Sequence, residues 1–539
     1  MLLTGVVLAL QVAVGLDTPT VAEARSAQRA FELMRRMHLP RTARDGYQPC
    51  DIRVGRFCYW YAPGEPDPPP ESGLVSGGRQ ELLHLLQLAS AAHPADGWLP
   101  GQRVRYHMEA NQPDRALAAL SRCGAETWWC SSLAGMVLHE AGRDREADSA
   151  FTISLSAMDS AHLCDWLDLS PLTGDELPCS ARRGAAETLW LLGQPLWSAP
   201  GRDFRSEILA RRTMAVILAE SANVRGMRWG SDNAELLLRY GWARWYSRLR
   251  DAATTVYSDD HVRGHDREPS FAVLPEARIF SDSLPRIAPE SWDFDNPLAR
   301  ARYAPLLVSA LLPAASQLAR FPRGDSMLVA AAVSTTDAGL AADSTSRWLL
   351  GFDGSRLHHP TEDATPLLLT MPNTGWIAGI EVVGARSGRA ARTRVTVEPL
   401  SCGAGVCLSD LLIYAGDTAA ATIAQALPLA IADGRVSVSR GLGVLWEIHG
   451  MAAGSRARVT LAVSPPRPGL ARRLAIRLGL ARDRTAARMQ WDTVVRTTPQ
   501  TEVIVLSLPD GARGSHTVSL VVEFARGSVS AARDVELVP

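Results

Sequence analysis

The spacing of apolar residues changes near Ser326, and this change constrains the fold more than any other feature of the chain. Before Ser326 the spacing is helical, as in Gln80 to Ala91, where leucines recur every three or four residues. After Ser326, short apolar or alternating runs are separated by turn residues, which is the pattern of strands. These runs form two sets of about 100 residues each, the size of one β-sandwich.

The sequence therefore predicts a multidomain α+β protein with an all-α, repeat-like N-terminal region, a mixed middle region and two antiparallel, immunoglobulin-like β-sandwiches. A length of 539 residues requires several domains. The predicted parts are a signal peptide (1–15), a cysteine-stapled segment (16–76), a helical repeat region (77–183), a mixed region with a connector (184–322), a first sandwich (323–432) and a second sandwich (433–539).

Within these parts we expect helices near Ala22 to Met37 and Phe204 to Ala219. Leu298 to Leu318 is apolar but interrupted by proline, and we expect a buried helix pair there. Thr418 to Gly434 links the sandwiches and is expected to be partly helical.

The helical region contains a weak internal repeat. The spacings of a tetratricopeptide unit are matched by Gly135, Leu138, Gly142, Ala147 and Phe151. Thirty-one residues earlier, Asn111, Ala116 and Leu120 occupy the positions that correspond to Gly142, Ala147 and Phe151. The region resembles a short tetratricopeptide-like array, although it lacks the consensus Trp, and such arrays present a concave protein-binding face. The alternative is a plain helical bundle.

The eight cysteines fall into four neighbouring pairs, which predicts four local disulfides in an oxidising compartment. The pairs are Cys50/Cys58, Cys123/Cys130, Cys164/Cys179 and Cys402/Cys407. Zinc is the alternative, but the sequence has no C-x2-C pair and no histidine at finger spacing.

The first residues are typical of a signal peptide. Leu2 to Val14 are apolar, and Ala13-Val14-Gly15 fits a small-x-small cleavage site. The run is too short to span a membrane, and it lacks an arginine before it, so a buried N-terminal segment is the alternative. We expect export to the periplasm, cell surface or medium, with no transmembrane span after cleavage.

Composition excludes several classes of protein. The chain has no lysine, which excludes P-loop hydrolases, protein kinases and pyridoxal phosphate enzymes. The net charge of −1 argues against a nucleic-acid partner. We expect no cofactor.

Residues 180–320 contain the most distinctive motif. Trp229-Gly230-Ser231-Asp232 is followed by Arg239-Tyr240-Gly241-Trp242. This pair resembles the GWxTD domain of exported bacterial proteins, with the order Trp-Gly and with Ser231 in place of threonine. That family also combines helical repeats with β-rich modules. The resemblance implies a relationship to exported bacterial proteins and implies no particular reaction.

One polar cluster has the residue types of a metal site. It contains Asp259, Asp260, His261, His265 and Asp266, with two histidines four residues apart. Gly264 and Pro269 favour a solvated loop instead. If the protein is an enzyme, the cluster is the predicted site of a metal-dependent hydrolase.

Three further motifs are interpreted as structural. Arg323-Gly324-Asp325-Ser326 is expected to be a turn before a strand, although it matches an integrin-binding tetrapeptide. His139-Glu140 lacks the second histidine of a zinc protease motif, because Arg143 stands there. His358-His359 precedes Pro360 and is expected in an exposed loop.

Leu470 to Arg488 is basic and amphipathic, with Arg472, Arg473 and Arg477 among its cations. It could contact lipid headgroups or an anionic glycan, or it could be a helix on the sandwich with arginines in solvent. The leading functional expectation is an exported, non-enzymatic interaction or scaffold protein of the bacterial envelope. Its partner would be an envelope or secreted protein. The hydrolase and the peripheral envelope-binding protein are the alternatives.

Overall fold

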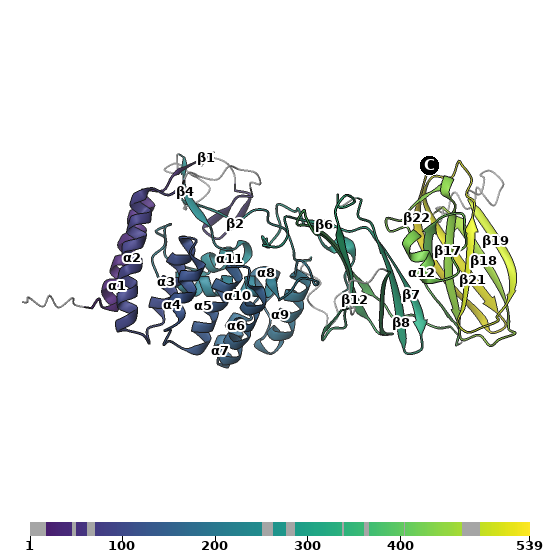
Figure 1. The fold of residues 1–539 in the computed structure, drawn as a ribbon, viewed down its shortest axis with the longest axis horizontal. Helices are drawn as coiled ribbons and strands as arrows, with labels where there is room; N and C mark the ends of the chain where they lie inside the picture. The colour runs from purple at the N-terminus through teal and green to yellow at the C-terminus, as the bar shows by residue number, and fades with distance from the viewer. Residues whose placement is uncertain are drawn as a thin grey trace, which may run out of the picture. The chain divides into compact units, whose positions relative to one another are not determined.

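The computed structural model describes residues 18–45, 50–61, 70–250, 262–275, 286–336, 339–359, 366–403, 405–465 and 486–539. The chain divides into two compact units, as Figure 1 shows. The N-terminal unit contains residues 1–190, 201–270 and 297–304, and the C-terminal unit contains 191–200, 271–296 and 305–539. The chain therefore passes between the units several times.

Helices dominate the N-terminal unit. They are α1 (Val21–Met37), α2 (Gly73–Ala92), α3 (Trp98–Glu109), α4 (Pro113–Leu120), α5 (Thr127–Glu140), α6 (Asp144–Ala157), α7 (Ser160–Trp166), α8 (Ser170–Thr173), α9 (Cys179–Gly193, which reaches the unit boundary), α10 (Asp203–Ala219) and α11 (Ser231–Tyr240). The three helices predicted from apolar spacing, now α1, α2 and α10, are confirmed. The start of α1 is set by a capping box, in which Thr20 and Glu23 each accept the other's backbone N–H.

Two helical hairpins, α3/α4 and α5/α6, repeat at the predicted offset. The turn of each contains a left-handed residue, Asn111 (φ 55°) and Gly142 (φ 71°). In the second hairpin, α5 and α6 approach so closely that a Cβ on Gly135 would lie 3.0 Å from the Phe151 ring. The hairpins follow the sequence spacing, while their assignment to the tetratricopeptide family stays a prediction.

The N-terminal unit also contains short strands. They are β1 (Arg41–Asp45), β2 (Ile52–Val54), β3 (Phe57–Tyr59), β4 (Trp245–Arg250) and β5 (Val262–His265). β2 and β3 form a hairpin, and β1, β4 and β5 form a three-stranded sheet with β4 at its centre. Most of the distinctive motif from Trp229 to Trp242 lies in α11.

Strands dominate the C-terminal unit. They are β6 (Ala310–Pro313), β7 (Ser316–Arg323), β8 (Ser326–Val333), β9 (Thr345–Phe352), β10 (Leu357–His358), β11 (Leu367–Pro372), β12 (Trp376–Gly384), β13 (Arg389–Val397), β14 (Cys407–Leu408), β15 (Leu412–Ala415), β16 (Arg435–Ser437), β17 (Leu442–His449), β18 (Arg456–Ser464), β19 (Ala487–Val494), β20 (Gln500–Leu506), β21 (Gly514–Phe524) and β22 (Gly527–Val538). A short helix, α12 (Ile423–Ala426), lies in the predicted linker.

These strands form two pairs of sheets. The first pair has the orders β10-β9-β12-β13-β6 and β11-β8-β7, and its shared core includes the fully buried Met327, Trp376 and Ile380. The second pair has β14-β17-β15, with β20 also on β17, and β16-β22-β21-β18-β19. Trp446 and Leu520 are buried in its core. The mixed α+β class is confirmed, and the immunoglobulin-like assignment stays a prediction.

Two expectations for this half differ from the structure, and the turn expected at Arg323–Ser326 is confirmed. The helix pair expected at Leu298 to Leu318 is wrong, because its end forms β6 and the start of β7. The short apolar run there suits a buried strand as well as a helix. The sheets are also not wholly antiparallel, since β6 pairs with β13 and β16 with β22 in parallel. Gly324, at φ 66°, makes the Arg323–Ser326 segment the turn between β7 and β8.

All four predicted disulfides are present: Cys50–Cys58, Cys123–Cys130, Cys164–Cys179 and Cys402–Cys407. They are formed between neighbours in sequence, as the pairing of the cysteines indicated. Among the helices of the described ranges, none is long and apolar enough to cross a membrane. The expected signal peptide lies outside the described residues.

Candidate binding cleft and buried histidine cluster of the N-terminal unit

A cleft of about 480 Å³ lies in the N-terminal unit. Its walls come from segments that are far apart in the sequence: Tyr59, Trp60 and Tyr61 at and after β3, the stretch from Arg263 to Ser270 at and after β5, and the end of α3. Trp245 of β4 adds another aromatic wall. We call this space the aromatic cleft.

The β2–β3 hairpin carries the aromatic wall, and α11 holds that hairpin in place. The Arg56 guanidinium donates to both carboxylate oxygens of Asp232, at 2.7 and 2.8 Å, and the Arg56 backbone N–H donates to Asp232 at 3.1 Å. These hydrogen bonds from Arg56 lower the pKa of Asp232 to about 2. Gly55 is required at the turn, because a Cβ there would lie 2.4 Å from the Cβ of Asp232.

The Arg-Tyr-Gly part of the motif supports the same wall. The Tyr240 ring stacks on Tyr59, with centroids 3.7 Å apart and planes 10° apart. Arg239 fixes this tyrosine by donating to its hydroxyl at 2.9 Å and to the carbonyl of Arg300 at 2.6 Å. Gly241 follows with φ 85°, which ends α11.

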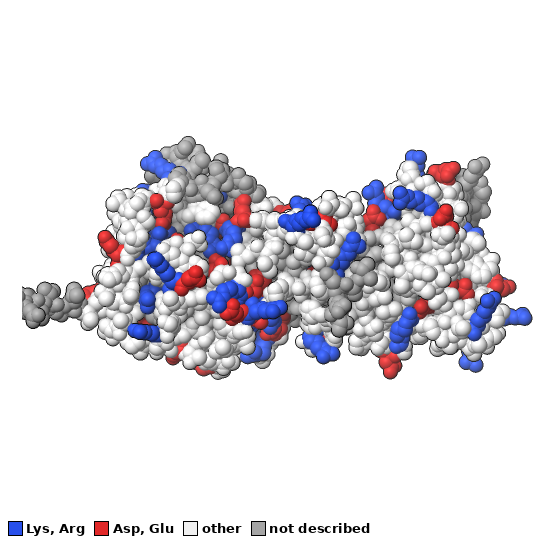
Figure 2. All heavy atoms as spheres, in the orientation of Figure 1, with Lys and Arg blue, Asp and Glu red and all other residues white. Residues whose placement is uncertain are grey.

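The cleft continues into a small charged recess lined by Trp242, Glu140 and Glu207. Glu140 pairs with Arg244 at 2.5 Å and with Arg267 at 3.3 Å. Basic and acidic side chains also alternate over the face of this unit shown in Figure 2. The cleft therefore offers charge of both signs beside its aromatic rings.

His265 and Asp266 are neighbours at the cleft, and the pKa of the histidine is lowered whereas the pKa of the aspartate is raised. Burial, with a contribution from Arg263, lowers the pKa of His265 to about 4, and its ring accepts or donates a 2.7 Å hydrogen bond with the Ser247 hydroxyl. Burial raises the pKa of Asp266 to about 6 in spite of the hydrogen bond with Tyr59. Perturbed acids in a cleft are typical of functional sites.

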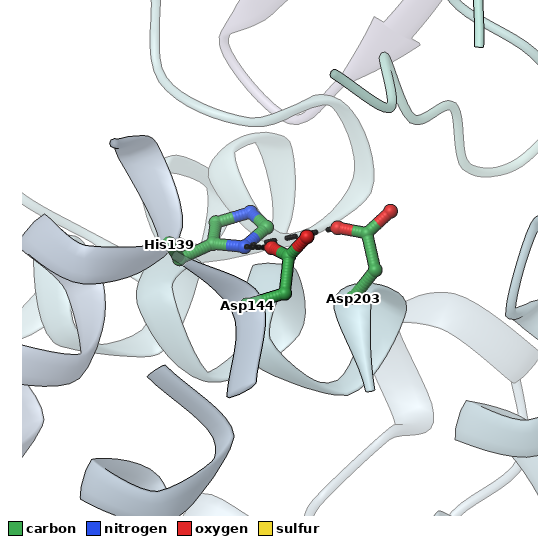
Figure 3. Close-up of side chains that lie close together, drawn as sticks. All are labelled: His139, Asp144 and Asp203. Atoms are coloured by element: carbon green, nitrogen blue, oxygen red, sulfur yellow. Dashed lines mark ion pairs between the residues drawn. The ribbon is translucent and has the colours of Figure 1, made fainter. Parts of the chain in front are cut away.

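Beneath the recess lies a buried cluster around His139 of α5. The imidazole Nε2 is 2.7 Å from Glu207, which also accepts from Arg211 at 2.6 Å. On the other side, Nδ1 lies 3.7 Å from Asp144 and 3.8 Å from Asp203. Dashed lines mark these two ion pairs in Figure 3. Tyr303 donates a hydrogen bond to Asp203.

Backbone turns bring these groups together. His139 is near the end of α5 and Asp144 is the first residue of α6, so the left-handed Gly142 between them places both at one corner of the hairpin. Gly201 (φ 85°) precedes Asp203, the first residue of α10, and a Cβ on it would lie 2.9 Å from Asp144. Glycine is thus required for this close approach.

The cluster has unusual electrostatics. Burial opposes protonation of His139, but the Asp144, Glu207 and Asp203 carboxylates outweigh it and raise the His139 pKa to about 10. Burial raises the pKa of Asp203 to about 6, whereas Arg211 and His139 hold the pKa of Glu207 well below its usual range. Two groups of three potential metal ligands occur among the described residues: His139 with Asp144 and Asp203, and His139 with Glu140 and Glu207.

The metal ligands predicted from the sequence are different residues from these. Asp259, Asp260 and His261 lie outside the described residues. His265 and Asp266 do reach the cleft, but neither belongs to a three-ligand group in the described part of the chain. The basic candidates Arg472, Arg473 and Arg477 also lie outside the described ranges.

His139 was set aside at the sequence level because Arg143 replaces the second histidine of a zinc protease motif. Its real partners are Asp144, across a glycine turn, and Asp203, more than sixty residues later. The sequence signal for the His139–Asp144 pair was a histidine on the buried face of a helix, followed by a glycine turn and an aspartate. No sequence signal indicated that Asp203 would join them.

No family model and no curated protein matches the sequence, so the GWxTD resemblance stays a prediction. One solved structure that matches is dimeric latent PorU from Porphyromonas gingivalis. The identity is 12% and the TM-score 0.20, over 41% of this chain and 20% of that one. The match spans only a fifth of that protein and is too distant to carry an argument about fold or function.

Proposed function

We propose that this protein is an exported interaction protein of the bacterial cell envelope, and that the aromatic cleft receives a segment of a protein partner. In this proposal the helical hairpins form a tetratricopeptide-like support for the cleft. The two sheet pairs are immunoglobulin-like modules that act as spacers or adhesion surfaces.

The composition of the cleft carries this proposal. Four of its lining residues are tyrosine or tryptophan and three are arginine, counting Tyr59–Tyr61 and Trp245 with Arg244, Arg263 and Arg267. Tyr, Trp and Arg are the residue types that dominate binding energy at protein interfaces. The four disulfides are consistent with export.

Site-specific photo-crosslinking in the native bacterium tests the proposal. Tyr61, which is half-buried at the cleft, is replaced by benzoylphenylalanine, and Trp128, which is half-buried but does not line the cleft, serves as the matched control. We expect a discrete protein adduct from position 61 that is absent from position 128. Equal adducts at both positions, or none at either, would refute a role for the cleft.

The alternative is a hydrolase that uses the cleft, and the raised pKa of Asp266 favours it as a general acid. Hydrolysis of a panel of envelope peptides and glycans by the wild type, abolished in Asp266→Asn, would replace the interaction proposal with an enzymatic one. Binding that survives without any turnover would retain the first proposal.

A further inference from the structure

We propose that His139, Asp144 and Asp203 bind a divalent transition-metal cation, with Zn²⁺ the preferred ion, and that this ion is structural. The site would join the corner between α5 and α6 to the first turn of α10. None of its three ligands lines the aromatic cleft, and the proposal does not depend on what the cleft binds.

The geometry supports a ligand between the three side chains. Nδ1 of His139 and Oδ1 of Asp144 have no hydrogen-bond partner among the described residues, although His139 is only 3% exposed and Asp144 7%. Buried polar atoms are otherwise nearly always paired. The 3.7 and 3.8 Å separations are too long for a proton on Nδ1 to bridge.

A metal ion fits the same distances. With metal–ligand distances of about 2.1 Å, a tetrahedral site separates its ligand atoms by about 3.4 Å. The three ligand atoms lie within 4.8 Å of one another, so movements of at most about 0.7 Å at each side chain would close the site. One imidazole and two carboxylates are ligands that suit Zn²⁺ and related ions.

The surroundings of His139 match those of a metal-bound histidine. Its Nε2 contacts Glu207 at 2.7 Å, and a carboxylate on the far nitrogen is the usual partner that orients a ligating imidazole. Tyr303 donates to Oδ1 of Asp203, the same oxygen that lies 3.8 Å from Nδ1 of His139, and so holds this carboxylate in place. Figure 3 shows the His139, Asp144 and Asp203 side chains pointing toward one another.

The charge balance points the same way. Asp144, Asp203 and Glu207 supply three negative charges, and Arg211 offsets one of them through its contact with Glu207. A dication would displace the proton from Nδ1 of His139 and offset the other two charges. All three ligands are buried, so the ion would be shielded from bulk solvent, and a water molecule would complete its tetrahedron.

The test uses the full chain without a histidine tag, purified and dialysed against a chelator, then titrated with Zn²⁺ against a competing indicator. We expect one ion per chain, a visible absorption band on Co²⁺ substitution, and a rise in the thermal midpoint on adding Zn²⁺. Asp144→Asn and Asp203→Asn should lose the stoichiometric ion. Asp114→Asn, in the exposed first turn of the equivalent helix α4, should keep it.

Glu207→Gln provides a graded variant, because loss of an orienting partner weakens metal affinity by about 10- to 100-fold. If the cluster instead holds a protonated histidine, Zn²⁺ will not bind stoichiometrically. Asp203→Asn will then be as stable as the wild type or more stable, since it removes one of three crowded acids. That result would overturn the proposal even if another variant failed to fold.

Discussion

Replacing Asp232 with asparagine should loosen the hairpin that carries the aromatic wall of the cleft. The Asp232 carboxylate accepts two guanidinium bonds and one backbone bond from Arg56. Asparagine keeps the shape but loses the charge and one acceptor oxygen. The perturbation therefore removes a charge-assisted clamp between α11 and the β2–β3 turn.

The size of the effect follows from the pKa of Asp232. A fall from 3.8 to about 2 corresponds to about 2.4 kcal/mol of stabilisation of the ionised, folded form. The Arg56 side chain is 36% exposed, so solvent screens part of this interaction. We expect a loss of about 1 kcal/mol for Asp232→Asn at pH 7.

The pH dependence has a definite sign. Because the folded-state pKa is lowered, the stabilisation is fully present above the ordinary pKa of 3.8 and is lost as the pH falls towards 2. Roughly half of it should remain at pH 3. The difference between wild type and Asp232→Asn should therefore shrink on acidification.

Hydrogen exchange with mass spectrometry measures the local stability of the hairpin. A local measurement is needed because the chain has two compact units, which can unfold separately. A loss of about 1 kcal/mol predicts about fivefold faster exchange in β2, β3 and the start of α11 at pH 7. Asp492→Asn is the matched control: its pair with Arg458 is exposed on both sides, so exchange in β18 and β19 should not change. Unchanged exchange at the hairpin, or an equal difference at pH 3 and pH 7, would refute the reasoning.

Three further substitutions test the packing. Glu381→Ala removes a fully buried carboxylate that accepts from the backbone N–H groups of Trp197 (2.7 Å) and Ser198 (2.9 Å) and faces Arg394. We expect the free energy of unfolding to fall by about 3–5 kcal/mol, with rapid hydrogen exchange in residues 191–200. A fall of less than about 1 kcal/mol would contradict this expectation. Gly135→Val should reduce stability by about 1–3 kcal/mol in thermal unfolding because it overlaps the Phe151 ring, whereas Gly184→Val, with open space around it, should show no loss. Gln317→Ala leaves backbone groups of Ile413 and Ile431 unpaired and should lower the free energy of unfolding in guanidinium by about 2–3 kcal/mol, while the exposed Gln425→Ala should have little effect.

Local patterns were sufficient for much of the fold. The alternation in β18 and β21 is visible in the sequence because each strand has one buried and one exposed face. The disulfides were predictable because each cysteine pairs with a neighbour along the chain. The Asn111 and Gly142 turns could be aligned because both end a helix in the same left-handed conformation.

Short segments were the main source of error. β6 and the start of β7 were expected to be helical, since a brief apolar run with prolines does not distinguish a buried strand from a helix. The strands β2 and β3 are three residues each, too short for a periodic signal. Their position depends on the Cys50–Cys58 disulfide and on Arg56, which reaches a carboxylate in α11.

The amino-acid sequence by itself determined the helical first half, the strand-rich second half and the four covalent links, because all of these depend on residues close together in the chain. The tertiary structure alone determined the cleft and the histidine cluster. Tyr59, Glu207 and Asp266 meet at one recess, and His139 meets Asp203, through contacts between segments separated by dozens of residues. Apolar spacing specifies which face of an element is buried, but the partner of each buried polar group is decided only when the elements pack.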